Sequence, residues 1–387
     1  ITITQEKINQ VLGLSLTLDS ILDVFHRLSF ETEVSGSTIQ VTVPTRRLDI
    51  SIEEDLIEEV GRIHGIDDLE EKLPLVSSKP GSYERKYEKE KQIKQRLESL
   101  GMSEVMTYTL TSKENLAMFT LDEFDPIVMQ DPLAEDKMYM RYSILPSLLQ
   151  VAKYNLARKN KDLALYECSD IYYLKDGKVQ TKTYLAGLIC GTVLENLWQH
   201  QKIKADFYYL KGIVENLLSY LGLANRYHFI VEKVPKEFHP YQSACITLDK
   251  DVIGYIGMIH PKLAKESIYV FEIDLDYIFE KRIRQIKDKE ISKYPTIEKD
   301  LAFLVDRKVY VDDMIKTIQK ASGKLLVNIT VFDLYEGENI AEDKKSVAFR
   351  LTYQDVNRTL QEEEVMVLFH KTIEEVTKKH QAILRDK

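Results

Sequence analysis

The sequence has few cysteines and no long apolar run. Its 387 residues include only Cys168, Cys190 and Cys245, which are widely spaced and form no pair with metal-ligand spacing. This pattern predicts buried thiols in a reducing compartment and argues against a disulfide framework. No apolar run approaches the roughly 20 residues needed to cross a bilayer, and the first residues, ITITQEKINQ, lack the basic start and apolar centre of a signal peptide. We therefore expect a cytoplasmic protein with no membrane partner.

The common motifs of nucleotide-binding and hydrolytic enzymes are also absent from the sequence. The chain has no G-x-S-x-G, Walker or G-x-G-x-x-G motif. None of its eight histidines forms an H-x-x-x-H pair, the arrangement that holds zinc on one face of a helix. The formal net charge of −9 argues against a protein that coats nucleic acid, but it leaves room for a local RNA contact.

The remaining composition is that of a large folded protein. The chain is 44% hydrophobic and 30% charged, and its length predicts two or three domains. The patterns indicate an α+β multidomain fold: helices and a β-hairpin in 1–75, an antiparallel sheet with helices in 83–285, and a β-α-β-β-α-β order in 290–387. That last order is typical of a ferredoxin-like domain. Residues 70–82 contain Pro, Ser and Gly and read as a linker. Because the first residue is Ile rather than Met, we expect a piece of a longer protein.

An acidic segment follows the hairpin. Six carboxylates fall within eleven residues: Asp49, Glu53, Glu54, Asp55, Glu58 and Glu59. The pattern predicts a helix over about 52–64, with Ser51 as N-cap and Glu54 completing a capping box.

On this helix Asp55, Glu58 and Glu59 share one face, and Asp49 lies just before it. Carboxylates are the ligands that Mg²⁺ takes, but acids in a first helical turn also complement the helix dipole. The residues alone leave both a cation site and a solvated helix face open.

The last predicted sheet has two faces of different character. One set of alternating residues is apolar and is expected to face the two helices: Leu301, Phe303, Val305, Phe332, Leu334, Val347, Phe349 and Leu351. The other set forms an open face with Ala302, Asp333, Tyr335, Ser346, Ala348 and Arg350. An exposed aromatic ring, an arginine and short polar groups suit an unpaired RNA base. A half-solvated antiparallel sheet has the same pattern without any ligand, so both interpretations stay open.

Five segments resemble the β subunit of bacterial phenylalanyl-tRNA synthetases, in that family's order and from end to end of the chain. They are VPTRRLDISIEEDLIEEVGRIHGID, TYTLTS, DPLAEDKMYMRYSILPSLLQVAKYNLARK, DFYYLKGIVENLL, and the final YPTIEKDLAFLVD…FDLYEG…KKSVAFRLTYQ…RTLQEEEV. The resemblance implies a middle domain with a class II synthetase fold that has lost its chemistry, and a C-terminal anticodon-binding domain. It also implies that the family's N-terminal tRNA-binding and editing modules are missing, so we assign no editing residue here.

The resemblance implies a division of labour between two subunits. A class II site needs an arginine on a glycine-rich segment, and the nearest glycine pair, Gly254 and Gly257 in IGYIGMIHPK, carries none. We therefore expect no catalytic residue in this chain. ATP and phenylalanine would be used by the α subunit, in a heterotetramer of two α and two β chains that charges tRNA-Phe. The alternative is a stand-alone RNA-binding or scaffold protein that reuses these modules.

The resemblance also implies site residues. The family's magnesium ligands, at a site shared with the α subunit, match Asp49, Asp55, Glu58 and Glu59. The family usually has Trp near Arg46 and Pro at Leu48, so the turn before Asp49 departs from its pattern. The family's contacts to an anticodon base match four residues of the open face: Ala302, Asp333, Tyr335 and Ser346.

Overall fold

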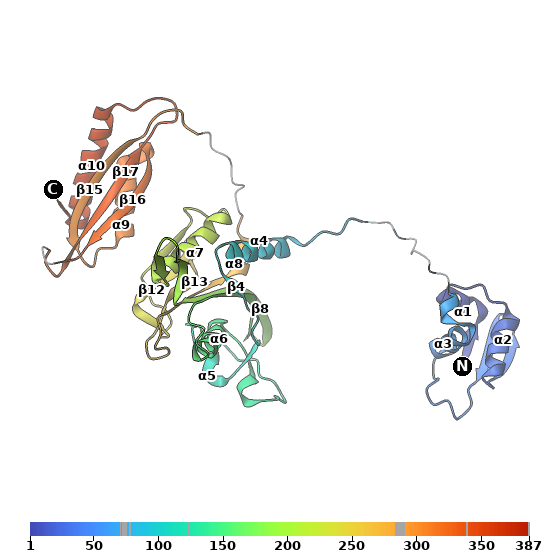
Figure 1. The fold of residues 1–387 in the computed structure, drawn as a ribbon. Helices are drawn as coiled ribbons and strands as arrows, with labels where there is room; N and C mark the ends of the chain where they lie inside the picture. The colour runs from blue at the N-terminus through green and yellow to red at the C-terminus, as the bar shows by residue number, and fades with distance from the viewer. Residues whose placement is uncertain are drawn as a thin grey trace. The chain divides into compact units, whose positions relative to one another are not determined.

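The computed structural model describes residues 1–69, 71, 76, 79–122, 124–282, 291–337 and 340–385 (Figure 1). The chain divides into two compact units, residues 1–85 and 86–387. The predicted α+β multidomain class is confirmed. The linker predicted at 70–82 falls mostly outside the described residues, and the three domain boundaries stay predictions. No helix within the described ranges is both long and apolar enough to cross a membrane.

The first unit packs three helices against a small antiparallel sheet of order β1-β3-β2. Its elements are β1 (Thr2–Thr4), α1 (Gln5–Leu12), α2 (Leu18–Arg27), β2 (Glu31–Ser35), β3 (Thr38–Thr42), α3 (Glu53–His64) and the 3-10 helix η1 (Ile66–Asp68). The first two helices begin at threonine caps, Thr4 and Thr17, each worth about 1 kcal/mol. The apolar sides meet in one core that includes Ile8, Phe25 and Leu56. The helices and hairpin predicted for this unit are confirmed.

The start of α3 differs from its prediction by one residue. Its N-cap is Ile52 rather than Ser51, and Ile52 has no side-chain acceptor. Instead Asp55 reaches back, and its Oδ2 accepts the N–H groups of Ser51 at 2.7 Å and Ile52 at 2.9 Å. This satisfies two backbone donors that the helix itself cannot, so Asp55 rather than Glu54 completes the helix start.

The middle of the chain forms a seven-stranded sheet of order β11-β12-β13-β14-β8-β7-β4. Its strands are β4 (Ser103–Glu104), β7 (Leu163–Lys175), β8 (Lys178–Cys190), β11 (Tyr227–Ile230), β12 (Phe238–Leu248), β13 (Asp251–Ile259) and β14 (Ile268–Asp274). All pairs are antiparallel except β4 with β7, as the short turns between strands predicted. Strand packing is close enough at Gly254 that a Cβ there would lie 1.9 Å from the carbonyl oxygen of Glu272.

Helices flank this sheet and build two apolar cores. They are α4 (Arg85–Ser99), α5 (Lys113–Leu116), α6 (Leu145–Ala157), α7 (Phe207–Tyr220), α8 (Leu275–Glu280) and the 3-10 helix η2 (Glu135–Lys137). One core joins α4 and α7 to the sheet, and the other joins α6 to it. Two small antiparallel pairs complete this region: β5 (Leu110–Thr111) with β6 (Tyr139–Met140), and β9 (Thr192–Asn196) with β10 (Gln201–Lys204).

Two strand predictions in this region are wrong. EVMTYTL was expected as one strand, but only its ends are extended and paired, and Met106 and Tyr108 are exposed rather than half-buried. VFEIDLDYIF was expected as one strand, but β14 ends at Asp274. Asp274 accepts the N–H of Tyr277 and caps α8, so a capping side chain outweighs the strand pattern there.

The C-terminal region has the predicted β-α-β-β-α-β order. Its elements are β15 (Ile297–Asp306), α9 (Val311–Ser322), the 3-10 helix η3 (Gly323–Leu325), β16 (Leu326–Tyr335), β17 (Lys344–Tyr353), α10 (Glu362–His380) and β18 (Ile383–Leu384). The antiparallel sheet has the order β16-β17-β15-β18. Both helices contribute to one core with the apolar strand face, where Phe303 and Phe349 are fully buried.

The prediction that Phe332 and Leu334 are buried is wrong. Each side chain is 53% exposed. β16 is an edge strand, and its register against β17 shifts between Val331 and Asp333, so Phe332 is the extra residue of a β-bulge. A bulge breaks the strict alternation of faces. The ring of Phe332 lies under the guanidinium of Arg350, 5.4 Å from its centroid, on the open side of the sheet.

Candidate functional site

The acidic segment is held by arginines of the same unit. Arg47 donates from Nε to Oδ1 of Asp49 at 3.0 Å and from Nη2 to Oδ2 at 2.6 Å. It also donates from Nη1 to Oε2 of Glu59 at 3.0 Å. Arg62 donates to both oxygens of Glu59, at 3.2 and 2.7 Å. Glu59 is only 5% exposed, and a buried carboxylate needs such charged partners.

These contacts keep the acids ionised. Hydrogen bonds from Arg47 and then Arg62 lower the pKa of Glu59 to about 2. The hydrogen bond from Arg47 lowers the pKa of Asp49. The backbone N–H groups of Ser51 and Ile52 lower the pKa of Asp55. All three residues are therefore carboxylates at neutral pH, because hydrogen bonds to the charged form favour it.

The residues do not fit a bound Mg²⁺ in this arrangement. Asp49 and Glu59 direct their oxygens at arginines, and Oδ2 of Asp55 is taken by backbone N–H groups. Glu58 is exposed on α3. In the part of the chain that the structure describes, no group of three or more His, Cys, Asp or Glu side chains is arranged to hold a metal. Helical spacing alone could not reveal Arg47, which takes the position of a cation between Asp49 and Glu59.

The four residues predicted to contact a base all lie on the open face of the C-terminal sheet. Ala302 of β15 pairs with Ala348 of β17, and Asp333 of β16 pairs with that same Ala348. Tyr335 pairs with Ser346, one row further along. Ser346 and Ala348 are buried, at 3% and 7% exposed, although an open face was expected there, whereas Tyr335 is 37% exposed. Alternation along each strand thus brings these residues to one surface.

The ring of Tyr335 has room because of a glycine. A Cβ at Gly337 would lie 2.5 Å from the Tyr335 hydroxyl oxygen and 2.6 Å from Cζ of its ring. Such contacts are too short for any other residue without a shift of the ring. Gly337 therefore lets the aromatic side chain fold back beside the turn that leaves β16.

Sequence reasoning missed Arg385 at this face. Its N–H donates to the carbonyl of Ala302 at 2.9 Å. Its side chain reaches over the sheet, with Nη1 at 3.5 Å from Oγ of Ser346 and Cζ at 5.9 Å from the Tyr335 ring centroid. The only sequence signal was a basic residue at the end of the predicted last strand, AILR. Because the pairing of that strand with β15 was unknown, nothing connected Arg385 to Tyr335.

The middle sheet contains a buried polar network that ties α6 to it. Arg141 donates to Oε1 of Glu167 at 3.0 Å and to Oγ1 of Thr107 at 2.8 Å. Oε1 of Glu272 accepts the N–H of Ile144 at 2.6 Å and the hydroxyl of Ser143 at 3.1 Å. Complete burial raises the pKa of Glu272 to about 7. These groups are satisfied by one another, so their arrangement fixes the start of α6.

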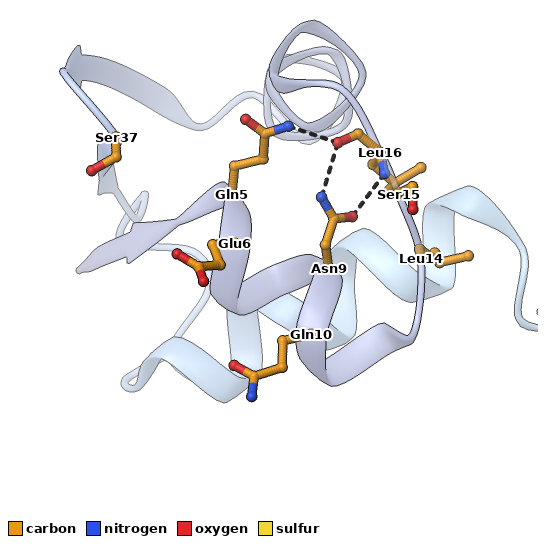
Figure 2. Close-up of a pocket in the computed structure, with 8 residues that line it drawn as sticks. All are labelled: Gln5, Glu6, Asn9, Gln10, Leu14, Ser15, Leu16 and Ser37. Carbon is orange, nitrogen blue, oxygen red and sulfur yellow. Dashed lines mark hydrogen bonds between the residues drawn. The ribbon is translucent and has the colours of Figure 1, made fainter. Parts of the chain in front are cut away.

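A hollow of about 590 Å³ lies beside α1 in the first unit (Figure 2). Six of its eight lining residues are polar, and the other two are leucines: Gln5, Glu6, Asn9, Gln10, Leu14, Ser15, Leu16 and Ser37. Gln5 and Asn9 both donate to the carbonyl of Leu16, at 2.8 and 2.9 Å, and the N–H of Leu16 donates back to Asn9 (Figure 2). These amides hold the connection between α1 and α2, which gives them a structural role.

Comparison with known proteins yields matches along the whole chain. Residues 69–275 match the family model described as the phenylalanyl tRNA synthetase beta chain CLM domain. Residues 292–385 match a ferredoxin-fold anticodon binding domain, and residues 1–66 match a tRNA synthetase B5 domain.

The curated relatives carry the same description. A phenylalanine–tRNA ligase beta subunit from Bacillus licheniformis is 37% identical over 391 residues, covering 100% of this chain and 48% of the relative. One from Listeria monocytogenes is 38% identical over 385 residues, covering 98% and 48%. The chain thus spans about half the length of the curated relatives it matches. Among solved structures, a pyrrolysyl-tRNA synthetase from Desulfitobacterium hafniense is similar over 58% of this chain and 77% of its own, with 16% identity and a TM-score of 0.39.

Proposed function

Since the chain belongs to the family of phenylalanyl-tRNA synthetase beta chains, we propose that it is the part of that subunit which supports the α subunit and contacts the tRNA anticodon. One observation carries the proposal: residues that match an anticodon-binding domain place Ala302, Asp333, Tyr335 and Ser346 on one face of a sheet. Of these, Asp333 and Tyr335 are exposed. Small side chains beside an aromatic ring give an unpaired base a surface to stack on and groups to hydrogen-bond.

The proposed ligand is tRNA-Phe, and its binding is local. The formal net charge of the chain is −9, so general attraction for RNA does not bring the two together. Arg385 beside Tyr335 supplies a positive charge at the proposed contact. The base would meet Asp333 and Ser346 as hydrogen-bonding partners and Tyr335 as a stacking partner.

The proposed protein partner is the α subunit, which would carry out the ATP-dependent attachment of phenylalanine in a heterotetramer of two α and two β chains in the cytoplasm. Large apolar side chains on the middle region support a docking role, because Met106, Tyr108 and Leu133 are all strongly exposed. Met106 and Tyr108 line a hollow of about 550 Å³ together with Gln150 and Val151 of α6. Exposed apolar groups gathered at one place commonly mark a protein interface.

A magnesium site at Asp49, Asp55, Glu58 and Glu59 is a separate proposal. Its support is the spacing of the acids, since carboxylate oxygens are the ligands that Mg²⁺ takes. In the observed arrangement Arg47 competes for the same oxygens. The proposal therefore requires that Arg47 leave Asp49 and Glu59 when the ion binds.

Co-elution separates the proposed function from a stand-alone RNA-binding or scaffold protein. The 387-residue chain and the α subunit are mixed and run on a size-exclusion column, with and without tRNA-Phe. A shared peak that takes up tRNA supports the proposal. Separate elution of the two proteins, with RNA bound by this chain alone, would favour the stand-alone protein.

A further inference from the structure

The β-bulge in β16 creates a second aromatic surface on the open face of the C-terminal sheet. Phe332 is the extra residue, and its ring is half-exposed under Arg350. Two residues later Leu334 pairs with Val347, which is fully buried in the core. Leu334 therefore belongs to the helix-facing side at the edge of the sheet, although it is as exposed as Phe332. Of these two exposed side chains, Phe332 is the one that a ligand on the face of Tyr335 can contact.

Arg350 is fixed in place beside this ring. Its Nε and Nη2 each donate to one oxygen of Asp300, both at 2.8 Å, and Asp300 is its cross-strand neighbour. A two-point hydrogen bond of this kind orients the planar guanidinium. Arginine planes and aromatic rings are both surfaces on which nucleic-acid bases stack. Phe332 and Arg350 are both partly exposed, so together they offer such a surface to a base.

The pair lies on the same face of the sheet as Tyr335, further along the strands. Tyr335 and Ser346 form one row of the open face, Asp333 and Ala348 the next, and Arg350 the row after that. Rows on one face are roughly 7 Å apart. Four-stranded sheets that read single-stranded RNA place aromatic residues in this way to stack two or three bases.

We propose that Phe332 and Arg350 form a second stacking platform, which holds the unpaired base next to the one at Tyr335. The proposal rests on the proposed anticodon contact, because the occupant is argued from the anticodon-binding match over 292–385 and from continuity with the Tyr335 surface. Stacking tolerates every base. The platform therefore adds affinity and holds the loop open, while Asp333 and Ser346 supply the base discrimination.

The test uses the 387-residue chain and an anticodon stem-loop in which 2-aminopurine replaces one loop base at a time. Stacking on an aromatic ring quenches this base, so titrations report both affinity and position. We expect wild-type protein to quench two neighbouring positions. Phe332→Ala should weaken binding by about 5- to 150-fold, the range of one base–aromatic stack, and should restore fluorescence at one position only.

Leu334→Ala is the matched control, since it lies on the same strand with the same 53% exposure but on the other side. It should bind like wild type. Arg350→Lys keeps a positive charge beside Asp300 but removes the planar guanidinium. It should restore fluorescence at the same loop position as Phe332→Ala. If Phe332→Ala binds like wild type while Tyr335→Ala is weakened, the second platform is wrong and the anticodon contact stands. If the wild-type chain binds no stem-loop, both are wrong.

Discussion

Arg47 donates a hydrogen bond of 3.0 Å to Glu59, twelve positions away, and thereby ties the loop before α3 to a buried carboxylate on that helix. Its guanidinium also lies 6.0 Å from the ring centroid of Phe30. One side chain thus occupies the place where the sequence pattern predicts an ion. The competition between an arginine and a metal for the same oxygens can be measured.

Replacing Arg47 by alanine should allow Mg²⁺ to bind the acidic segment. Removal of the guanidinium frees the oxygens of Asp49 and one contact of Glu59, and neighbouring carboxylates then favour a cation. In calorimetric titrations of the chain alone, Mg²⁺ should bind Arg47→Ala much more tightly than wild type. Arg46→Ala is the control, because Arg46 donates to the carbonyl of Leu28 instead. Equal binding by wild type and Arg47→Ala would show that Arg47 does not block the site.

Glu59 should make the chain less stable in acid. Its pKa is lowered from 4.5 to about 2 by the two arginines, so the unfolded state binds the proton first. The stabilisation is fully present above about pH 4.5 and is lost as the pH falls toward 2. Denaturant unfolding across this pH range should show that Glu59→Gln loses less free energy of unfolding than wild type does as the pH falls. Glu58→Gln, at an exposed neighbour on the same helix, is the control with the same change of charge. An equal pH dependence of the two variants would contradict the assignment.

Glu272 should have the opposite pH dependence. Burial raises its pKa from 4.5 to about 7, so the folded state keeps the proton longer, and stability should decline between about pH 4.5 and 7. Glu272→Gln retains an oxygen for Ile144 and Ser143 and should remove this decline. Glu272→Ala leaves both donors unpaired and should cost about 1–3 kcal/mol. Thermal unfolding at pH 5 and pH 8 separates the two variants, and identical behaviour would rule out a hydrogen-bonding role.

Tyr335→Ala should impair tRNA charging by the assembled ligase, mainly through the KM for tRNA. A base–aromatic stack is worth about 1–3 kcal/mol, which corresponds to a rise in KM of about 5- to 150-fold. Steady-state aminoacylation at several tRNA concentrations measures it. Tyr310→Ala serves as control, since Tyr310 is also exposed but lies at the start of α9. An unchanged KM would remove Tyr335 from the contact surface.

The sequence predicted those parts of the fold that local patterns decide. The helix Leu18–Arg27, the hairpin at 31–42 and the β-α-β-β-α-β order of the last region all follow from apolar spacing and turn residues, and all are confirmed. The resemblance to the phenylalanyl-tRNA synthetase β subunit is confirmed by the family models. The period of two along β15 assigned its buried residues correctly. Along β17 it predicted the burial of Val347, Phe349 and Leu351, but Ser346 and Ala348, expected on the open face, are buried as well.

The errors lie where a non-local or side-chain contact decides the outcome. Asp274 ends a strand by capping a helix. Phe332 lies on the open face instead of the helix-facing side because it is the extra residue of a bulge. Neither effect is visible in the spacing of apolar residues along the sequence. Arg47 lies in the loop before the predicted helix, and Arg385 ends a predicted short strand whose pairing was unknown. Only the folded chain therefore brings them to Glu59 and Tyr335. The roles assigned to the magnesium and anticodon residues remain predictions.

The bulge at Phe332 also changes the exposed edge of the C-terminal sheet. β16 is an edge strand with exposed Val327, Val331, Phe332 and Leu334, and a long apolar edge invites a strand from another copy to pair with it. A bulge interrupts the regular row of backbone donors and acceptors on such an edge. Deleting residue 332 would give an unbroken register from Asn328 to Tyr335, and with it a longer template for edge-to-edge aggregation.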